Sequence, residues 1–135
     1  MKELTIAATV ENIEVVTAFV NEQLDVLNCP NNARMQINIA IDELFGNIAH
    51  YAYYPQIGNV TILTEVIKQP LSIMITFIDQ GIPFDPLKKE DPDTGLSAAE
   101  RDIGGLGIFM VKKSMDEMSY GYRDGKNILS IKKLL

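Results

Sequence analysis

Apolar side chains follow two different rhythms along this chain, one typical of helices and the other typical of strands. In several stretches they recur every three or four positions, which gives a helix one apolar face. We predict a first helix over residues 11–27 and a second that follows Pro30 and ends near Tyr53, before Pro55. A third amphipathic stretch, with glycines at its start, predicts a helix over 105–116.

The remaining apolar runs are rich in β-branched residues, which favours strands. The predicted strands cover residues 4–8, 59–67, 71–78, 118–123 and 127–134. Asp124-Gly125 is the strongest short hairpin signal in the chain, because these residue types tolerate the positive φ angles of a two-residue turn. Since the strands come in pairs interrupted by helices, we expect an α+β fold in which helices cover one face of a mixed, largely antiparallel sheet.

Length and composition favour a single globular domain over residues 1–135, with 47% hydrophobic and 22% charged residues. The formal net charge of -6 repels phosphate backbones, so we expect no direct contact with nucleic acid. The single cysteine, Cys29, excludes an intramolecular disulfide and a metal site built on cysteine pairs. The sequence has no signal-like start and no apolar run of about 18 residues, so we expect a cytoplasmic protein without membrane contact.

Residues 86–102 form the one stretch of low hydrophobicity, a predicted loop of about 17 residues. Loops of this length are uncommon inside compact domains and are usually functional lids or disordered insertions. This one lies between two of the motifs described next, which favours a function.

The predicted second helix carries polar side chains along the edge of its apolar face. Glu43, Asn47 and His50 are three or four positions apart and therefore share one strip. A carboxylate and an amide one turn apart can hold a hydrated hard cation, with Glu43 orienting or deprotonating a water or hydroxyl; an ordinary solvated helix face is the alternative. His50 is the only histidine, so we predict no transition-metal site. Gly46 suggests the close approach of a neighbouring element or a ligand.

A second motif, Asp79-Gln-Gly-Ile-Pro-Phe-Asp85, directly follows a predicted buried strand. The Asp79 carboxylate can accept a hydrogen bond from an amine on a flat apolar ligand, and Gly81 lets backbone and ligand come close. A plain strand-ending turn is the alternative, because Asp, Gly and Pro are common turn residues.

A third motif, Gly104-Gly-Leu-Gly107, stands at the start of the predicted third helix. Free amide N–H groups and the helix dipole make such a position favourable for phosphate. A flexible hinge for the preceding loop explains these glycines equally well. The motif is not a P-loop, which requires Gly-Lys-Ser/Thr.

The order of these motifs resembles the GHKL superfamily of ATP-binding domains, which includes gyrase, histidine kinases and mismatch-repair ATPases, with their N, G1 and G2 boxes. Three phrases are similar to bacterial anti-sigma factor serine/threonine kinases. They are Asn47-Ile-Ala-His-Tyr-Ala-Tyr53, Asp79-Gln-Gly-Ile-Pro-Phe-Asp-Pro86 and Gly105-Leu-Gly-Ile-Phe-Met-Val-Lys-Lys-Ser-Met-Asp-Glu117. The resemblance covers nearly the whole chain.

Carried over residue by residue, the resemblance implies that Asn47 is the magnesium ligand and Glu43 the general base or water positioner. It implies that Asp79 accepts a hydrogen bond from the adenine amine and that Gly81 shapes the adenine pocket. The remaining implied nucleotide contacts are Gly105, Leu106, Gly107 and Lys112. Residues 86–103 are the implied ATP lid.

The same resemblance implies a Bergerat-type two-layer α/β sandwich that binds ATP and Mg²⁺. Its implied activity is that of a serine/threonine kinase, a transferase that phosphorylates an anti-sigma-factor antagonist. Its implied role in transcription regulation is to sequester a sigma factor, and family members commonly form homodimers.

One departure from the commoner G1 pattern is Pro83, which stands where a second glycine is usual, and proline makes a turn more rigid. The roles of Arg101 and Lys112 stay open, since either can neutralise phosphate. Three alternatives to a kinase remain at this point: a catalytically silent module that acts by stoichiometric sequestration, an ATP-hydrolysing conformational switch, and a sensor of another small molecule.

Overall fold

The computed structural model describes residues 1–88 and 105–135. Its strands and α-helices are β1 (Lys2–Ala7), α1 (Ile13–Val26), α2 (Asn31–Asn47), β2 (Asn59–Lys68), β3 (Leu71–Asp79), α3 (Gly105–Ser114), β4 (Glu117–Arg123) and β5 (Lys126–Leu134). Three short helical segments complete them: η1 (Val10–Asn12), the π-helical turn η2 (Ile48–Ala52) and η3 (Pro86–Lys88). Each helix and strand predicted from the sequence is present.

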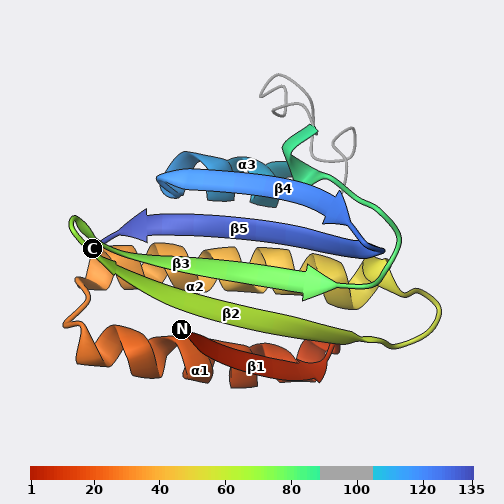
Figure 1. Ribbon diagram of the computed structural model, residues 1–135, viewed down its shortest axis with the longest axis horizontal. Helices are drawn as coiled ribbons and strands as arrows, with labels where there is room; N and C mark the ends of the chain where they lie inside the picture. Colours follow the sequence, from red (N-terminus) through yellow and green to blue (C-terminus); the bar gives the residue numbers. More distant parts are fainter. Residues whose placement is uncertain (89–104) are drawn as a thin grey trace.

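The strands form one five-stranded sheet in the order β1-β2-β3-β5-β4 (Figure 1). Within the described residues all neighbouring strands are antiparallel. The predicted α+β fold is therefore confirmed, and its sheet is antiparallel throughout this part of the chain. The predicted turn at Asp124-Gly125 is also present, with φ angles of 53° and 75° that suit a two-residue hairpin.

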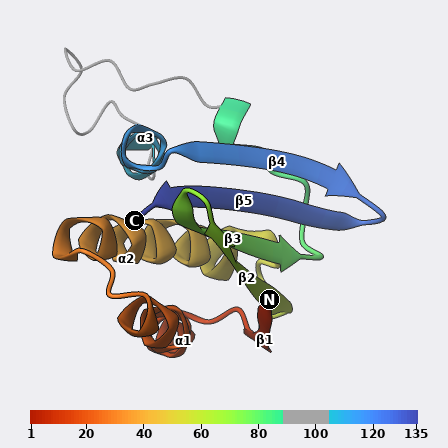
Figure 2. The same cartoon turned by 60° about the vertical axis from the view of Figure 1, so that its left-hand side comes forward.

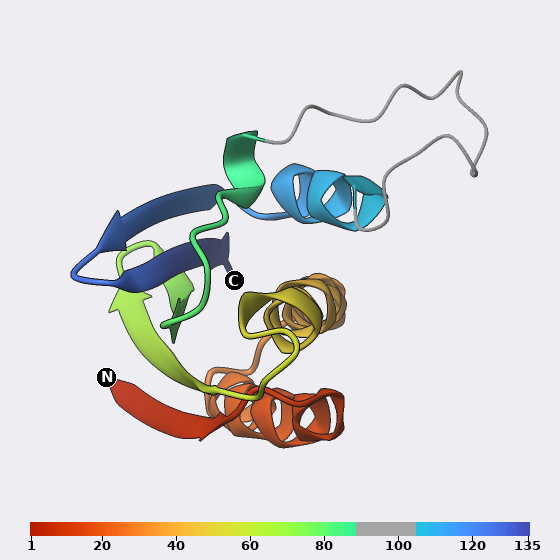
Figure 3. The ribbon, with the colours of Figure 1, turned by 90° about the vertical axis from the view of Figure 1, so that its right-hand side faces the viewer.

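The molecule has two layers, because α1, α2 and α3 all lie on the same face of the curved sheet (Figure 3). Figure 2 shows the same arrangement from an intermediate angle, with α2 between α1 and α3. The core lies between the layers, where alternate residues of β3 meet apolar helix positions. Fully buried side chains from both layers include Val20, Leu24, Ile37, Ile41, Ile75 and Phe77.

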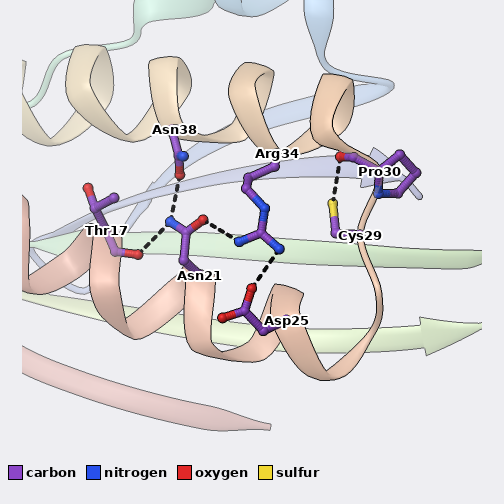
Figure 4. Close-up of polar contacts among 7 residues, drawn as sticks. All are labelled: Thr17, Asn21, Asp25, Cys29, Pro30, Arg34 and Asn38. Atoms are coloured by element: carbon purple, nitrogen blue, oxygen red, sulfur yellow. Dashed lines mark hydrogen bonds and ion pairs between the residues drawn. The ribbon is translucent and has the colours of Figure 1, made fainter.

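A polar network fixes α1 against α2 (Figure 4). The Asn21 amide donates to the Thr17 carbonyl and to Asn38 Oδ1, both at 2.7 Å. Arg34 donates to Asn21 Oδ1 at 2.8 Å and forms a 2.7 Å ion pair with Asp25. Because these side chains join the two helices, α2 has a defined position over the sheet.

The second helix changes character near its end. We predicted one helix as far as Tyr53, but α2 is α-helical only as far as Asn47 and continues as the π-helical turn η2. π-helical turns of this kind are frequent at functional sites. No helix within residues 1–88 and 105–135 is both long enough and apolar enough to cross a membrane.

Candidate functional site

Asp79 ends β3 on the face of the sheet that the helices cover, and its side chain is only 5% exposed. Asp79 Oδ1 accepts two hydrogen bonds at 2.9 Å, one from the Gly81 N–H and one from Asn127 Nδ2. Among the described residues, no group donates to Oδ2. A buried carboxylate oxygen without a donor is costly, so Oδ2 is suited to accept a hydrogen bond from a ligand.

Sequence reasoning missed Asn127, a buried residue of β5 that lies directly opposite Asp79 in the sheet register. Its Nδ2 also donates to the Ile82 carbonyl at 2.9 Å and contacts the Gly81 carbonyl at 3.4 Å. The sequence held one signal for Asn127. The Asp124-Gly125 hairpin fixes where β5 begins, and a pairing of β5 with β3 would then place Asn127 beside Asp79. Asn127 thereby holds the backbone of the segment 79–84, which we call the Asp79 turn.

The Asp79 turn also contacts the end of the second helix. The Ile82 N–H donates to the Ala52 carbonyl at 2.9 Å, and the Gln80 N–H donates to the Tyr53 hydroxyl at 2.7 Å. A Cβ atom at Gly81 would lie 2.3 Å from the Ala52 carbonyl oxygen, so only glycine fits there. The close approach seen at Gly81 is one of backbone to backbone, and the predicted approach of a ligand there stays a prediction.

Glu43 and Asn47 lie one turn apart on α2, and both are half-buried. Asn47 Nδ2 donates to Glu43 Oε1 at a long 3.4 Å, so the amide oxygen of Asn47 is turned away from the carboxylate. The predicted shared strip is present for these two residues, whereas His50 lies in η2 and is exposed.

Gly107 brings the start of α3 against Glu43. A Cβ atom at Gly107 would lie 2.1 Å from Glu43 Cδ, so the carboxylate packs directly on the glycine backbone. Together we call Glu43, Asn47 and Gly107 the Glu43 edge. The structure thus joins the second helix both to the Asp79 turn and to the start of α3, although the three are far apart in the sequence.

The other predicted residues of this region are only partly described. Gly105 and Leu106 are the first two residues of α3, and Lys112 lies half-buried near its last turn. Of the predicted lid, 86–88 form η3, whereas Arg101 and the rest of the lid lie outside the described residues.

The expectation that a neighbouring element approaches Gly46 is wrong for the described part of the chain. A Cβ atom there would meet nothing within 4 Å beyond its own stretch of helix. The other part of that expectation, the approach of a ligand, stays a prediction, and the open space beside Gly46 is compatible with it.

Two tyrosines beside the Asp79 turn have raised pKa values. Burial raises the pKa of Tyr53 and the charge of Asp79 adds to the increase, against the lowering effect of the Gln80 N–H. Burial likewise raises the pKa of Tyr120, whose hydroxyl donates to Asn127 Oδ1, with the Phe84 N–H acting in the opposite direction. Both hydroxyls therefore stay protonated and available as donors at neutral pH.

The donor set fits a hard cation only in part. Within residues 1–88 and 105–135, no three His, Cys, Asp or Glu side chains are grouped so as to hold a metal ion. Mg²⁺ at nucleotide sites commonly uses one or two protein oxygens and completes its shell with phosphates and water. The outward amide oxygen of Asn47 fits such a minimal site.

Comparison with known proteins decides the family. A model of the histidine kinase-like ATPase domain matches residues 6–133, which is most of the sequence. The chain belongs to this family. Membership in the histidine kinase-like ATPase family implies an ATP-binding domain.

Several proteins to which the chain is similar are named as protein kinases. The chain is 28% identical over 100 residues to the serine-protein kinase RsbW of Bacillus cereus, a match that covers 71% of this chain and 61% of that protein. It is 26% identical over 99 residues to the serine/threonine-protein kinase BtrW of Bordetella bronchiseptica, covering 73% of this chain and 68% of BtrW. The similarity to RsbW of Bacillus mycoides is 25% over 134 residues, covering 96% of this chain and 82% of that protein.

A solved structure supports the fold of this ATPase-family chain independently. A chain in the crystal structure of the SiaB-SiaC complex from Pseudomonas aeruginosa matches with a TM-score of 0.61 at 15% identity. The match covers 98% of this chain and 89% of that chain. At this identity the likeness establishes the fold alone.

Proposed function

We propose that this protein is an anti-sigma factor serine/threonine kinase. In this proposal it binds Mg-ATP, phosphorylates an anti-sigma-factor antagonist and sequesters a sigma factor. It acts in the cytoplasm, where ATP and sigma factors are present, and it acts as a homodimer. The observation that carries the proposal is the packing of the Glu43 carboxylate on Gly107 at the start of α3.

The Asp79 turn supports adenine binding. Asp79 Oδ2 is buried and accepts no hydrogen bond within the described residues, so an exocyclic amine would satisfy it. Gly81 and Ile82 pack on η2, which makes this acceptor part of a fixed frame. A ligand that binds here needs no rearrangement of the turn, which lowers the entropic cost of binding.

The Glu43 edge supports phosphoryl transfer. The first amides of α3 favour phosphate, since a helix N-terminus carries unpaired N–H groups and a positive dipole end. Glu43 at this position takes the proton from the attacking serine or threonine hydroxyl. Asn47 would hold Mg²⁺ through its amide oxygen, and the ion would neutralise charge on the phosphates.

The relatives support the class of partner. RsbW and BtrW are named as serine or serine/threonine-protein kinases, which act on proteins. A protein substrate is therefore a better proposal for this chain than a small metabolite.

A second candidate function is stoichiometric sequestration without phosphorylation. Pro83 favours it, because proline replaces the glycine that is commoner in the G1 turn and limits how far the turn can adjust to a nucleotide.

The test measures transfer of labelled γ-phosphate from Mg-ATP to purified candidate antagonists of the same organism. We expect transfer by the wild type and a loss of about 100-fold or more in Glu43→Gln, which keeps the shape of the side chain but removes the base. Asn47→Ala should lose transfer as well. Glu65→Gln, at an exposed carboxylate of β2, is the matched control and should leave the rate unchanged.

Three results would contradict parts of the proposal. Stable binding of an antagonist or sigma factor without labelling would favour sequestration. Release of phosphate with no protein acceptor present would indicate an ATP-hydrolysing switch. No increase in thermal stability with ATP and Mg²⁺ would favour a sensor of another small molecule.

A further inference from the structure

The carboxamide of Asn127 has only one orientation that its surroundings allow. Its Oδ1 accepts from the Phe84 N–H at 3.2 Å and from the Tyr120 hydroxyl, while its Nδ2 faces three acceptors. If the amide were flipped, its oxygen would face the Asp79 carboxylate and two carbonyl oxygens, and its NH₂ would face an N–H donor. The side chain is also 6% exposed, so water cannot compensate.

This fixed amide holds the Asp79 carboxylate, whose two oxygens are equivalent acceptors, in one orientation. Asn127 Nδ2 and the Gly81 N–H both require an acceptor at the Oδ1 position of residue 79. Two donors converge there, and Oδ2 is left as an acceptor without a donor among the described residues. The two donors to one oxygen thus fix the direction in which the other oxygen faces a ligand.

We propose that Asn127 is a positioning residue that makes the site select a base with an amino group over one with an oxo group at the same position. The inference rests on the proposed function, since it concerns the nucleotide bound there. Asn127 reaches the base only through Asp79. An amino group donates to Oδ2, whereas an oxo group would place two acceptors against each other in a buried site.

The first experiment compares ADP with inosine diphosphate, which has an oxo group in place of the adenine amine. Both affinities are measured by titration calorimetry in the presence of Mg²⁺. We expect the wild type to prefer ADP by about 100-fold or more. In Asn127→Leu, which keeps the volume but removes the donor, this preference should fall at least about tenfold, mainly through weaker ADP binding.

Matched variants separate positioning from general packing. Tyr120→Phe removes one donor to Asn127 Oδ1 but leaves the bond from Nδ2 to Asp79, so its ADP preference should stay within about threefold of the wild type. Asn38→Leu removes a half-buried amide of α2 that bonds to α1 and has no contact with the Asp79 turn, so it should leave the ratio unchanged. Thermal unfolding of each variant checks that it is folded.

A second variant inverts the preference and does not depend on the folding of Asn127→Leu. In Asp79→Asn the new amide must place its oxygen at the Oδ1 position, because Asn127 Nδ2 and the Gly81 N–H both donate there. Its NH₂ then faces the ligand. We expect Asp79→Asn to bind inosine diphosphate more tightly than ADP.

The outcomes distinguish the two proposals. If the wild type binds ADP, but Asn127→Leu weakens ADP and inosine diphosphate equally and Asp79→Asn still prefers ADP, Asn127 is merely structural and the inference is wrong. If the wild type binds neither nucleotide, the proposed function fails, and the inference fails with it.

Discussion

The Asp79 turn and the Glu43 edge meet the same helix but are held very differently. In the Asp79 turn, Asp79 is 5% exposed, and most of the hydrogen bonds that fix the turn measure 2.7–2.9 Å. At the Glu43 edge the two polar side chains are half-buried, and the bond between them is 3.4 Å. The Asp79 turn is thus fixed by short hydrogen bonds before any ligand binds, whereas the bond between Asn47 and Glu43 is long enough to tighten.

This difference matches the two tasks in the proposed function. Recognition of a base requires a fixed acceptor, because a mobile one would not discriminate between donors. Proton transfer requires a group that tightens its contacts once substrate is present, and catalytic hydrogen bonds are often long in the free protein. Glycine substitutions in the two regions test this contrast directly.

The largest expected effect is that of Gly81→Ala. The new Cβ would lie 2.3 Å from the Ala52 carbonyl oxygen, and backbone atoms on both sides cannot move cheaply. The free energy of unfolding should fall by about 2–3 kcal/mol, measured by urea denaturation. Gly121→Ala is the control, because its nearest contact is 4.0 Å away. A stable Gly81→Ala would show that the Asp79 turn is not rigid.

Gly107→Ala should cost less stability although its clash is even closer. The Cβ would lie 2.1 Å from Glu43 Cδ, the far end of a flexible side chain that can rotate away. We expect a loss of about 1 kcal/mol or less in the free energy of unfolding. Phosphate transfer should nevertheless fall about tenfold or more, because Glu43 is displaced. If Gly107→Ala has normal stability and an unchanged rate of phosphate transfer, Glu43 takes no part in the transfer reaction.

Gly46→Ala should stabilise the protein. Nothing lies within 4 Å of the added Cβ outside its own helix, and alanine favours a helix over glycine. The free energy of unfolding should rise by about 0.5–1 kcal/mol, as thermal and urea unfolding would detect. If ADP binding weakens at the same time, the open space at Gly46 is used by the nucleotide.

The smallest expected effect is a loss of stability at alkaline pH that comes from the Asp79 turn. The raised pKa values of Tyr53 and Tyr120 mean that the unfolded chain ionises first, near pH 10. Their contribution is complete below this pH and is lost as the pH rises through the raised values. Tyr53→Phe and Tyr120→Phe should each reduce the fall in the free energy of unfolding at alkaline pH, as measured by urea denaturation across this pH range. Cys29, whose pKa burial also raises, should be replaced by Ala in all samples.

The candidate site residues come from short segments that the sequence alone singles out. Asp79-Gln-Gly81 and Gly105-Leu-Gly107 are short motifs whose residue types by themselves indicate a chemical role. Glu43 and Asn47 are recognised by their helical spacing. The structure brings Gly107 and the Asp79 turn against the second helix, and their joint binding of a nucleotide stays a prediction. The expectation for Gly46 was wrong in part, because a glycine inside a helix says nothing about which element lies opposite.

The sequence by itself determined the helices, the strands and the hairpin at Asp124-Gly125, because periodicity and turn chemistry depend on neighbours along the chain. Only the tertiary structure decided that Asn127 holds Asp79, since the two residues are 48 positions apart and meet through the register of β3 and β5. That register is set by burying one face of the sheet under the helices, and a shift of β5 by one residue would turn Asn127 to the other face, away from Asp79.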